Sequence, residues 1–507
     1  MTASIEPLSA SCEAAFCRLI VQRTGIVLQD HQLSNLRDTV INACRLFGYR
    51  DCEQYLECLQ DGYGAAFEYL IAGITVGESY FFRDSEQIEL LRGELLPRMI
   101  AAKRHAGDLS LRIWSAGCSQ GQEIYTIALL LLELLPDIDD WRIHLLGTDI
   151  NGDAVARALR GRYSAWSFRA TPNALRERWF TQSGDEYEIH PQIRRMARFA
   201  YLNLTMDMYP SILSETNAMD LILCRNVFIY LDRSAVRRCM TQYAHCLQQD
   251  GVLMLAASDP IDSSVDALQL VQTGLTAYFR KVSTRAEEWP VRAVVPAAVL
   301  PALPNVPVVQ PVAAVQLVSA VQPAVRPVAV PPSGASNDQP SFDIAVLIGL
   351  LNDSNWEAVL AQVDAALRAG IEDSDLWQIK AKALANQGRA AAALQACQRS
   401  LQLDPGNKHT YLLQGLILSE LDKLPQAEAA LRKTLYLDHS FLEAHYELGM
   451  LRVRVKDFSG ALKSLGNALK LAKTGEPERE LHNAAGMTYR RFAEVLENEI
   501  AMLSNAG

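Results

Sequence analysis

The strongest constraint on how this chain can fold is the stretch 109–132, which joins a strand pattern, a glycine turn and an apolar helix pattern. Apolar and polar residues alternate over 109–113, as in a half-buried strand, and a long apolar run covers 124–135. Gly117 and Gly121 stand between them, where glycine lets the backbone turn sharply and approach a ligand closely. Because ligands of open α/β sheets bind beyond the carboxyl ends of the strands, this turn is the natural place for a cofactor. A plain tight turn remains the alternative, since the glycine spacing matches neither the dinucleotide fingerprint nor the phosphate-binding loop.

A second candidate strand covers 141–149 and ends in Asp149, and a helix pattern follows it. In nucleotide-binding sheets, an acidic residue about 20 positions after the glycine turn accepts hydrogen bonds from the ribose hydroxyls. Asp149 lies 28 residues after Gly121 and fits this role. The alternative is that Asp149 only caps the helix that follows. Together the two segments favour nucleoside binding.

Length and composition narrow the class of protein. A chain of 507 residues is too long for one hydrophobic core, so two or three domains are expected. A net charge of -10 and a pI of about 5.5 give no general attraction to nucleic acid or anionic membranes. The ten cysteines form no Cys-x-x-Cys pair and no Cys/His cluster, which indicates a reducing cytoplasm and no structural zinc. No signal peptide pattern or bilayer-length apolar run is found, so we expect a cytoplasmic protein without membrane insertion.

Apolar residues recur at helical spacing over 11–70, and Gly25 and Gly48 mark expected helix ends. This predicts a helical N-terminal domain, 1–72, with no evident chemistry of its own. Shortly after this domain come the aromatic residues Tyr80, Phe81 and Phe82, followed by Arg83. On spacing alone they form a core anchor with a solvated charge, but their position just before the predicted sheet favours a place in the site.

Five motifs of the chain, taken together in their order, resemble those of a known family. They are Ser79-Tyr-Phe-Phe-Arg83, Ser115-Ala-Gly-Cys-Ser-Gln-Gly-Gln-Glu-Ile-Tyr125, Gly147-Thr-Asp-Ile150, Tyr201-Leu-Asn-Leu204 and Asp220-Leu-Ile-Leu-Cys-Arg-Asn-Val-Phe-Ile-Tyr230. In order and approximate spacing the chain resembles the CheR-type chemotaxis receptor methyltransferases, over about residues 10–283. This family transfers a methyl group from S-adenosylmethionine to glutamate side chains of chemoreceptors. The resemblance implies a doubly wound α/β methyltransferase domain over 73–287, behind the helical domain, with a small antiparallel subdomain inserted at about 161–200.

The resemblance also implies a cofactor site. Glu123 would meet the amino group of the methionine part of S-adenosylmethionine, and Asp149 its ribose. Asn203 and Leu204 would border the adenine. The full set of implied cofactor residues is Gly77, Ser79, Arg83, Gly117, Glu123, Asp149, Asn203, Leu204, Arg225 and Asn226.

For the reaction itself, the resemblance implies two residues. Arg83 would hold the acceptor carboxylate through a bidentate pair, and Tyr230 would line the site of methyl transfer. A carboxylate is already ionised at neutral pH, so the reaction needs no general base, and no metal is expected. The chain departs from the family at Gly77, where an asparagine is usual, which removes a possible hydrogen bond to the cofactor. It also has Gln122 where a glutamate is usual, next to the retained Glu123.

Within the predicted insertion, alternation around 183–185 indicates a hairpin. Arg194, Arg195 and Arg198 would give it a basic face, which either meets acidic receptor helices or is a solvated surface. Further along, 220–230 and 251–258 are continuously apolar, as in parallel strands covered on both faces.

The composition changes between Trp289 and Pro340, which contain eleven of the 21 prolines. Because proline fixes φ and lacks an N–H donor, we expect 288–340 to be an extended, partly polyproline linker. A spacer is favoured over a proline-rich docking site.

After the linker, four sets of residues recur with a period of 34: Trp377, Tyr411 and His445; Ala381, Gly415 and Gly449; Ala393, Ala427 and Ala461; and Cys397, Leu431 and Leu465. This period, with small residues where two helices touch, is the tetratricopeptide pattern. We expect repeats over 341–507, including a degenerate unit from near Phe342. A last helix from about Glu478 to Leu503 would cap the stack.

The sequence therefore predicts methyl esterification of glutamate side chains on the cytoplasmic part of a chemoreceptor-type signalling protein, with repeats that bind a further protein partner. Two alternatives stay open. One is a methyltransferase for another acceptor, for which the acidic pI argues against nucleic acid. The other is a weakly active or non-catalytic scaffold that works through its repeats, and Gly77 supports it.

Overall fold

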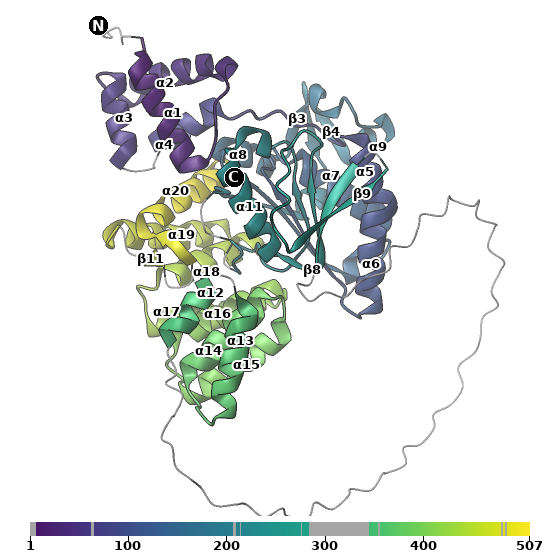
Figure 1. The fold of residues 1–507 in the computed structure, drawn as a ribbon, viewed down its shortest axis with the longest axis vertical. Helices are drawn as coiled ribbons and strands as arrows, with labels where there is room; N and C mark the ends of the chain where they lie inside the picture. The colour runs from purple at the N-terminus through teal and green to yellow at the C-terminus, as the bar shows by residue number, and fades with distance from the viewer. Residues whose placement is uncertain are drawn as a thin grey trace, which may run out of the picture. The chain divides into compact units, whose positions relative to one another are not determined.

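The structure is a computed structural model that describes residues 7–61, 65–205, 209–212, 214–274, 276–282, 344–352, 355–477, 480–481 and 484–506. The described residues form an N-terminal helical region, an α/β sheet region and a C-terminal helical region (Figure 1). The predicted linker, 288–340, lies outside the described residues. Within the described ranges, no helix has the length and apolar character needed to cross a bilayer.

The N-terminal region contains the predicted helices: α1 Ala10–Thr24, α2 Leu33–Phe47, α3 Cys52–Asp61 and α4 Ala65–Ile74, with a short 3₁₀ turn, η1 Asp30–Gln32. Gly25 and Gly48 end α1 and α2 with φ of +67° and +75°, as the sequence predicts. Phe16, Leu36 and Tyr55 are fully buried between these helices.

A seven-stranded sheet forms the centre of the α/β region, in the order β6-β2-β1-β7-β8-β10-β9. The strands are β1 Ser110–Ala116, β2 Arg142–Asp149, β6 Ala197–Tyr201, β7 Met219–Cys224, β8 Leu247–Leu255, β9 Leu268–Thr273 and β10 Thr276–Lys281. The first five in this order are parallel, and β10 pairs antiparallel with β8 and β9. The predicted strand 220–230 ends at Cys224, and a 3₁₀ turn, η5 Phe228–Tyr230, follows.

Helices cover the sheet on both faces, so the central strand β7 is buried along its whole length, whereas β9 at the edge is largely exposed. The covering helices are α5 Ser85–Leu90, continued through the π turn η2 Leu91–Leu95 into α6 Leu96–His105, α7 Gln122–Leu134, α8 Gly152–Arg160 and α11 Arg233–Cys246. Ile113 and Leu223 pack on the face with α6, α7 and α8, whereas Trp114 and Cys224 pack on the face with α11. A doubly wound sheet, as predicted, is the result.

The insertion is smaller than predicted. A three-stranded antiparallel sheet, in the order β3-β5-β4, is made by β3 Arg162–Ser164, β4 Phe180–Ser183 and β5 Glu186–Ile189, with η4 Ala165–Phe168, α9 Asn173–Trp179 and α10 Pro191–Arg194 around it. The hairpin at 183–185 is confirmed. However, β6 lies within 161–200 and pairs parallel with β2 in the main sheet.

The predicted basic face of the hairpin is therefore wrong. Arg198 is in β6, where its neighbours alternate between buried and half-buried positions, and it pairs with Glu215. Arg194 pairs with Glu188 of β5. The period-2 pattern of 197–201 belongs to a strand of the main sheet, and the arginine spacing alone did not separate the two sheets.

The C-terminal region consists of helix pairs, as the 34-residue period predicts. The helices are α12 Ile344–Asn352, α13 Trp356–Arg368, α14 Ser374–Asn386, α15 Ala390–Leu403, α16 Lys408–Glu420, α17 Leu424–Leu437, α18 Leu442–Arg454, α19 Phe458–Thr474 and α20 Tyr489–Ala506. Gly415 and Gly449 are small because a Cβ there would lie 2.9 Å and 2.7 Å from the leucine side chain of the paired helix.

The last helix begins later than predicted. It starts at Tyr489, and two short strands, β11 Glu480–Leu481 and β12 Ala484–Thr488, precede it. The stretch before Tyr489 contains His482, Asn483 and Gly486, which are weak helix formers.

The turn after β1 offers a test of the fold. Gly117 has φ of +79°, and a Cβ there would lie 2.4 Å from Val227. Gly117→Ala should therefore destabilise the sheet region by about 2–4 kcal/mol, through the left-handed backbone and the forced repacking. Gly107→Ala is the matched control, because its φ is +69° and no atom lies within 4 Å of the added Cβ. Urea unfolding followed by tryptophan fluorescence measures both, and equal midpoints would contradict the close approach of Val227.

Candidate cofactor site

A cavity opens at the carboxyl ends of β1, β2 and β7 and encloses about 1120 Å³ of empty space, its open mouth included. Most residues that the sequence assigned to the site lie together on its wall. They are Ser79, Arg83, Gly117, Glu123, Asp149, Asn203, Leu204, Arg225, Asn226 and Tyr230. The cavity therefore lies at the edge of the sheet where ligands of this architecture bind.

The glycine turn brings the backbone into this wall. Gly117 and Gly121 have φ of +79° and +88°, and α7 begins directly after Gly121. The turn is fastened to β2, because the amides of Gly117 and Cys118 both donate to the carbonyl of Thr148. Glu123 is thereby placed in the first turn of α7.

Asp149, the last residue of β2, closes the turn from the other side. Its Oδ2 accepts a hydrogen bond from the Ser119 amide (2.8 Å) and its Oδ1 accepts one from the Asn151 amide (2.9 Å). Burial raises the pKa of Asp149, and these two hydrogen bonds act in the opposite direction. Each oxygen keeps acceptor capacity for a ligand hydroxyl.

The alternative role of Asp149 as a helix cap is wrong. The N-cap of α8 is Asn151, whose side chain accepts a hydrogen bond from the Ala154 amide at 3.1 Å. Asp149 orients the residue that caps the helix and leaves its carboxylate at the cavity.

Glu123 is held by a buried ion pair. Its Oε1 accepts a hydrogen bond from the Ser115 hydroxyl (2.7 Å), and its Oε2 lies 3.0 Å from Nη1 of Arg225. The Arg225 side chain is 3% exposed and also donates to the Gln87 side chain and the Arg83 carbonyl, both at 2.6 Å. Arg225 thus joins β7, α7, α5 and the segment before α5. The sequence analysis did not assign Gln87 to the site, because no local pattern marks this buried polar residue of α5.

Arg83 and Tyr230 face the same cavity from different segments. The Arg83 Nη1 donates to the Glu78 carbonyl at 3.0 Å, and its guanidinium lies 5.6 Å from the centre of the Tyr80 ring. Burial raises the pKa of the half-buried Tyr230, and the charge of Arg83 acts in the opposite direction. The hydroxyl of Tyr230 therefore stays protonated at neutral pH and can donate a hydrogen bond.

The two asparagines of the predicted site have structural partners. The Asn203 amide donates to the Arg23 carbonyl (2.8 Å) and its oxygen accepts from the Thr205 amide (3.1 Å). Asn226, at φ +60°, donates its backbone N–H to the buried Asp259 at 2.7 Å and its side-chain amide to the Ser258 hydroxyl at 3.0 Å. Asp259 was not foreseen, although it is a carboxylate soon after a predicted strand.

The N-terminal region supplies a wall that the sequence did not indicate. The lining residues from this part of the chain are Thr24, Ile26, Gln32, Ile74 and Thr75. The region is fastened to the sheet region next to Tyr230, because the Val27 amide donates to the Tyr230 carbonyl at 2.8 Å. The helical domain therefore takes part in the site, contrary to the expectation that it has no chemical role.

Gly77 is the one predicted cofactor residue that does not line the cavity, although Val76 and Glu78 on either side of it do. Its carbonyl accepts a hydrogen bond from the Ser119 hydroxyl at 3.1 Å. A Cβ at this position would have its nearest neighbours, on Ser119 and Gln120, at 3.8 and 4.0 Å. A larger side chain therefore has room here. Among the described residues, no group of three or more His, Cys, Asp or Glu side chains could hold a metal ion.

Comparison with known proteins agrees with this geometry. The family model described as "CheR methyltransferase, SAM binding domain" matches residues 77–276, and a tetratricopeptide repeat model matches 374–407. The chemotaxis protein methyltransferase of Listeria innocua is 30% identical over 196 residues, which cover 39% of this chain and 70% of that protein. Chemotaxis protein methyltransferase 2 of Vibrio cholerae is 29% identical over 280 residues, or 54% of this chain and 95% of that protein.

One relative extends over the C-terminal region as well. The probable biofilm formation methyltransferase WspC of Pseudomonas aeruginosa is 25% identical over 446 residues, which cover 88% of this chain and 96% of that protein. With the sheet, the cavity and the helix pairs described above, these matches place the chain in the CheR family of S-adenosylmethionine-dependent methyltransferases, with tetratricopeptide repeats in its C-terminal region.

Proposed function

We propose that this enzyme methylates glutamate side chains on the cytoplasmic part of a chemoreceptor-type signalling protein, in the cytoplasm. The observation that carries the proposal is that Arg83 and Tyr230 share one cavity with Glu123 and Asp149. Arg83 and Tyr230 suit a carboxylate acceptor, and Glu123 and Asp149 suit the cofactor. The relatives named as chemotaxis protein methyltransferases support the same acceptor class.

The residues of the cavity fit S-adenosylmethionine. Glu123 offers a carboxylate to the ammonium group, and Asp149 offers acceptor lone pairs to the ribose hydroxyls. Ile26, Leu202 and Leu204 add apolar surface for the adenine. When bound, the cofactor supplies a methyl group activated by its sulfonium.

The chain itself has to position the acceptor and exclude water. A glutamate acceptor is ionised at neutral pH, so no residue needs to remove a proton. Arg83 would orient the two acceptor oxygens with its planar fork, and the protonated Tyr230 would donate a hydrogen bond beside them. Positioning in a site with little water supplies most of the rate.

The repeats, on this proposal, bind a further protein partner of the signalling assembly. Stacked helix pairs present extended binding surfaces, which supports this role. A second attachment makes the enzyme's encounter with its acceptor effectively intramolecular, and can raise avidity by about 10²–10⁴-fold.

A weakly active or non-catalytic scaffold is the second candidate function. Gly77 favours it, because the position lacks the side chain that the family uses beside the cofactor. A methyltransferase for another acceptor has less support, since nothing in the cavity selects a different acceptor chemistry.

Asp149 tests the cofactor assignment. Asp149→Asn replaces one acceptor oxygen by a donor and should weaken binding of S-adenosylhomocysteine by about 10–100-fold, or about 1–3 kcal/mol. Titration calorimetry measures this. Asp153→Asn, an exposed position in the first turn of α8, is the matched control and should leave the affinity unchanged. Normal affinity in a folded Asp149→Asn protein would count against the assigned pocket.

Arg83 tests the acceptor assignment. Arg83→Lys keeps the charge but loses the two-donor fork, so most transfer of radiolabelled methyl groups to receptor-containing membranes should be lost. Arg98→Lys, a half-exposed arginine of α6, is the control. Should the Arg83→Lys enzyme keep near-normal turnover, Arg83 does not orient the acceptor.

Gly77 separates the enzyme from the scaffold. Because the position has room for a side chain, Gly77→Asn should bind S-adenosylhomocysteine about 5–10-fold more tightly, as expected for one added hydrogen bond of about 1 kcal/mol. Gly93→Asn serves as the control, because no atom lies within 4 Å of the Cβ added there. An unchanged affinity would remove Gly77 as a reason to expect weak cofactor binding.

A further inference from the structure

One face of the helical repeats contacts the sheet region at the segment between β6 and β7. Because the repeats recur every 34 residues, Asn386, Glu420 and Arg454 occupy the same position at the ends of α14, α16 and α18. With Ala385 and Ser419 they form what we call the repeat face. All these residues are buried or largely buried, with side chains of Glu420 and Arg454 only 12% and 17% exposed. Stacked helical repeats use such extended faces to bind other proteins.

The segment that meets this face joins β6 to β7. We call the described residues 209–212 and 214–218 the connecting segment. Ile212 is 6% exposed and belongs to the same apolar cluster as Ala385 and Leu416 of the repeats. The Asn217 side chain donates to the Ala385 carbonyl at 3.3 Å. The repeats therefore hold part of the methyltransferase domain as they would hold a bound peptide.

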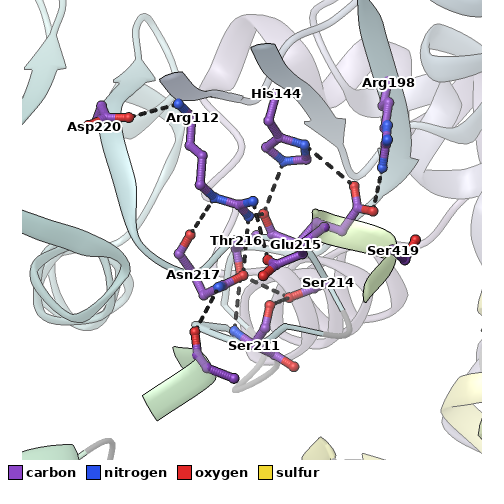
Figure 2. A network of polar contacts seen from close by, with 12 residues as sticks. Arg112, His144, Arg198, Ser211, Ser214, Glu215, Thr216, Asn217, Asp220 and Ser419 are labelled. Atoms are coloured by element: carbon purple, nitrogen blue, oxygen red, sulfur yellow. Dashed lines mark hydrogen bonds and ion pairs between the residues drawn. The ribbon is translucent and has the colours of Figure 1, made fainter. Parts of the chain in front are cut away.

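Basic side chains from three strands contact the connecting segment, as Figure 2 shows. Arg112 of β1 donates to the Glu215 carbonyl at 2.8 Å, and its other terminal nitrogen lies 3.2 Å from Glu420 of the repeat face. Arg198 of β6 forms an ion pair with the Glu215 carboxylate. Burial lowers the pKa of His144 of β2 well below its usual value, so this ring is neutral at neutral pH, and its Nε2 lies 3.2 Å from the Glu215 carbonyl oxygen. Burial raises the pKa of Glu215, but the surrounding cations, Arg454 among them, outweigh it and lower the pKa to about 2.

The connecting segment and the C-terminal region also contact residues that line the cofactor cavity. The Tyr209 hydroxyl of the connecting segment donates to the carbonyl of Leu204 at 2.6 Å, and Leu204 lines the cavity. Ile150, which follows Asp149 and also lines the cavity, packs in a cluster with Leu442 and Phe492 of the C-terminal region. The C-terminal region thus contacts Ile150 directly, and the repeat face is linked to Leu204 through the connecting segment.

Two buried polar atoms of the repeats near this contact lack a hydrogen-bond partner. Oε1 of Glu447 in α18 and Oδ1 of Asn386 in α14 are buried without a hydrogen-bond partner. Each such group costs about 1–3 kcal/mol relative to its solvated state. Apolar packing and the pair between Arg112 and Glu420 oppose this cost, whereas release of the contact would let both atoms bond to water.

We propose that the repeat face is a regulatory docking site for the connecting segment of the same chain, and that release of this contact lowers the affinity for the cofactor. The first half rests on the contacts alone. The second half rests on the proposed cofactor site. Occupation of the repeat face by another protein would then be coupled to the methyltransferase reaction through a shared two-state contact.

Glu420→Lys in the full chain tests the proposal from the repeat side. It places a lysine against Arg112, and a cation at the last residue of α16 does not weaken that helix. Hydrogen exchange in 209–218 should become at least tenfold faster, and the Kd for S-adenosylhomocysteine should rise about 5–20-fold, a typical coupling between two sites. Glu372→Lys, which disrupts the exposed pair with Arg399, is the control and should change neither quantity.

Ile212→Asp tests it from the other side. Its decisive readout lies across the interface, because exchange should increase in α14 and α16, which a purely local defect of the sheet region would not affect. Unchanged exchange in both variants overturns the docking site. Faster exchange with an unchanged Kd overturns the coupling. If the wild-type chain does not bind S-adenosylhomocysteine at all, the proposed cofactor site fails, while the exchange measurement still decides the docking.

Discussion

The candidate site depends most on the contacts that the buried guanidinium of Arg225 makes. Its pair with Glu123 is nearly shut off from solvent, and its other donors reach Gln87 and the Arg83 carbonyl. A buried charge is tolerated only when its partners are complete, and removal of one partner costs far more than an exposed pair of the same kind. Loss of any of these contacts would therefore displace the residues on both sides of the cavity. Arg225 is a positioning residue even though it also lines the cavity.

The same dependence explains which parts of the site could be predicted from the sequence. Asp149 stands at the end of a predicted strand, so a one-dimensional pattern places it correctly at the edge of the sheet, whereas Glu123 was assigned through the resemblance to the CheR family. Gln87, Asp259 and the N-terminal wall around Ile26 enter the site only through tertiary contacts. No local pattern separates a polar residue that packs against Arg225 from one that faces solvent.

In the fold, too, the features set by local geometry could be predicted, and those set by tertiary contacts could not. Periods of 2, 3.6 and 34 residues predicted the strands, the helices and the repeats, because each period is set by local geometry. Arg198 was assigned to the wrong sheet, since its three-arginine spacing fits an exposed hairpin as well as a sheet edge. The start of α20 was placed too early, because a charged stretch with weak helix formers does not mark its own boundary.

The contact between the repeats and the connecting segment is invisible in the sequence for a related reason. Glu215 and Glu420 lie in different regions, far apart in the sequence, and both pair with Arg112 or Arg198 only where the two regions meet. An interface with unpaired polar atoms, such as Oε1 of Glu447, would be weak between separate molecules. Within one chain it needs far less intrinsic affinity, because the tether keeps the local concentration of the partner high. A weak internal contact of this kind suits regulation, since a modest competing interaction is enough to change how often the nucleoside side of the cavity is held in place.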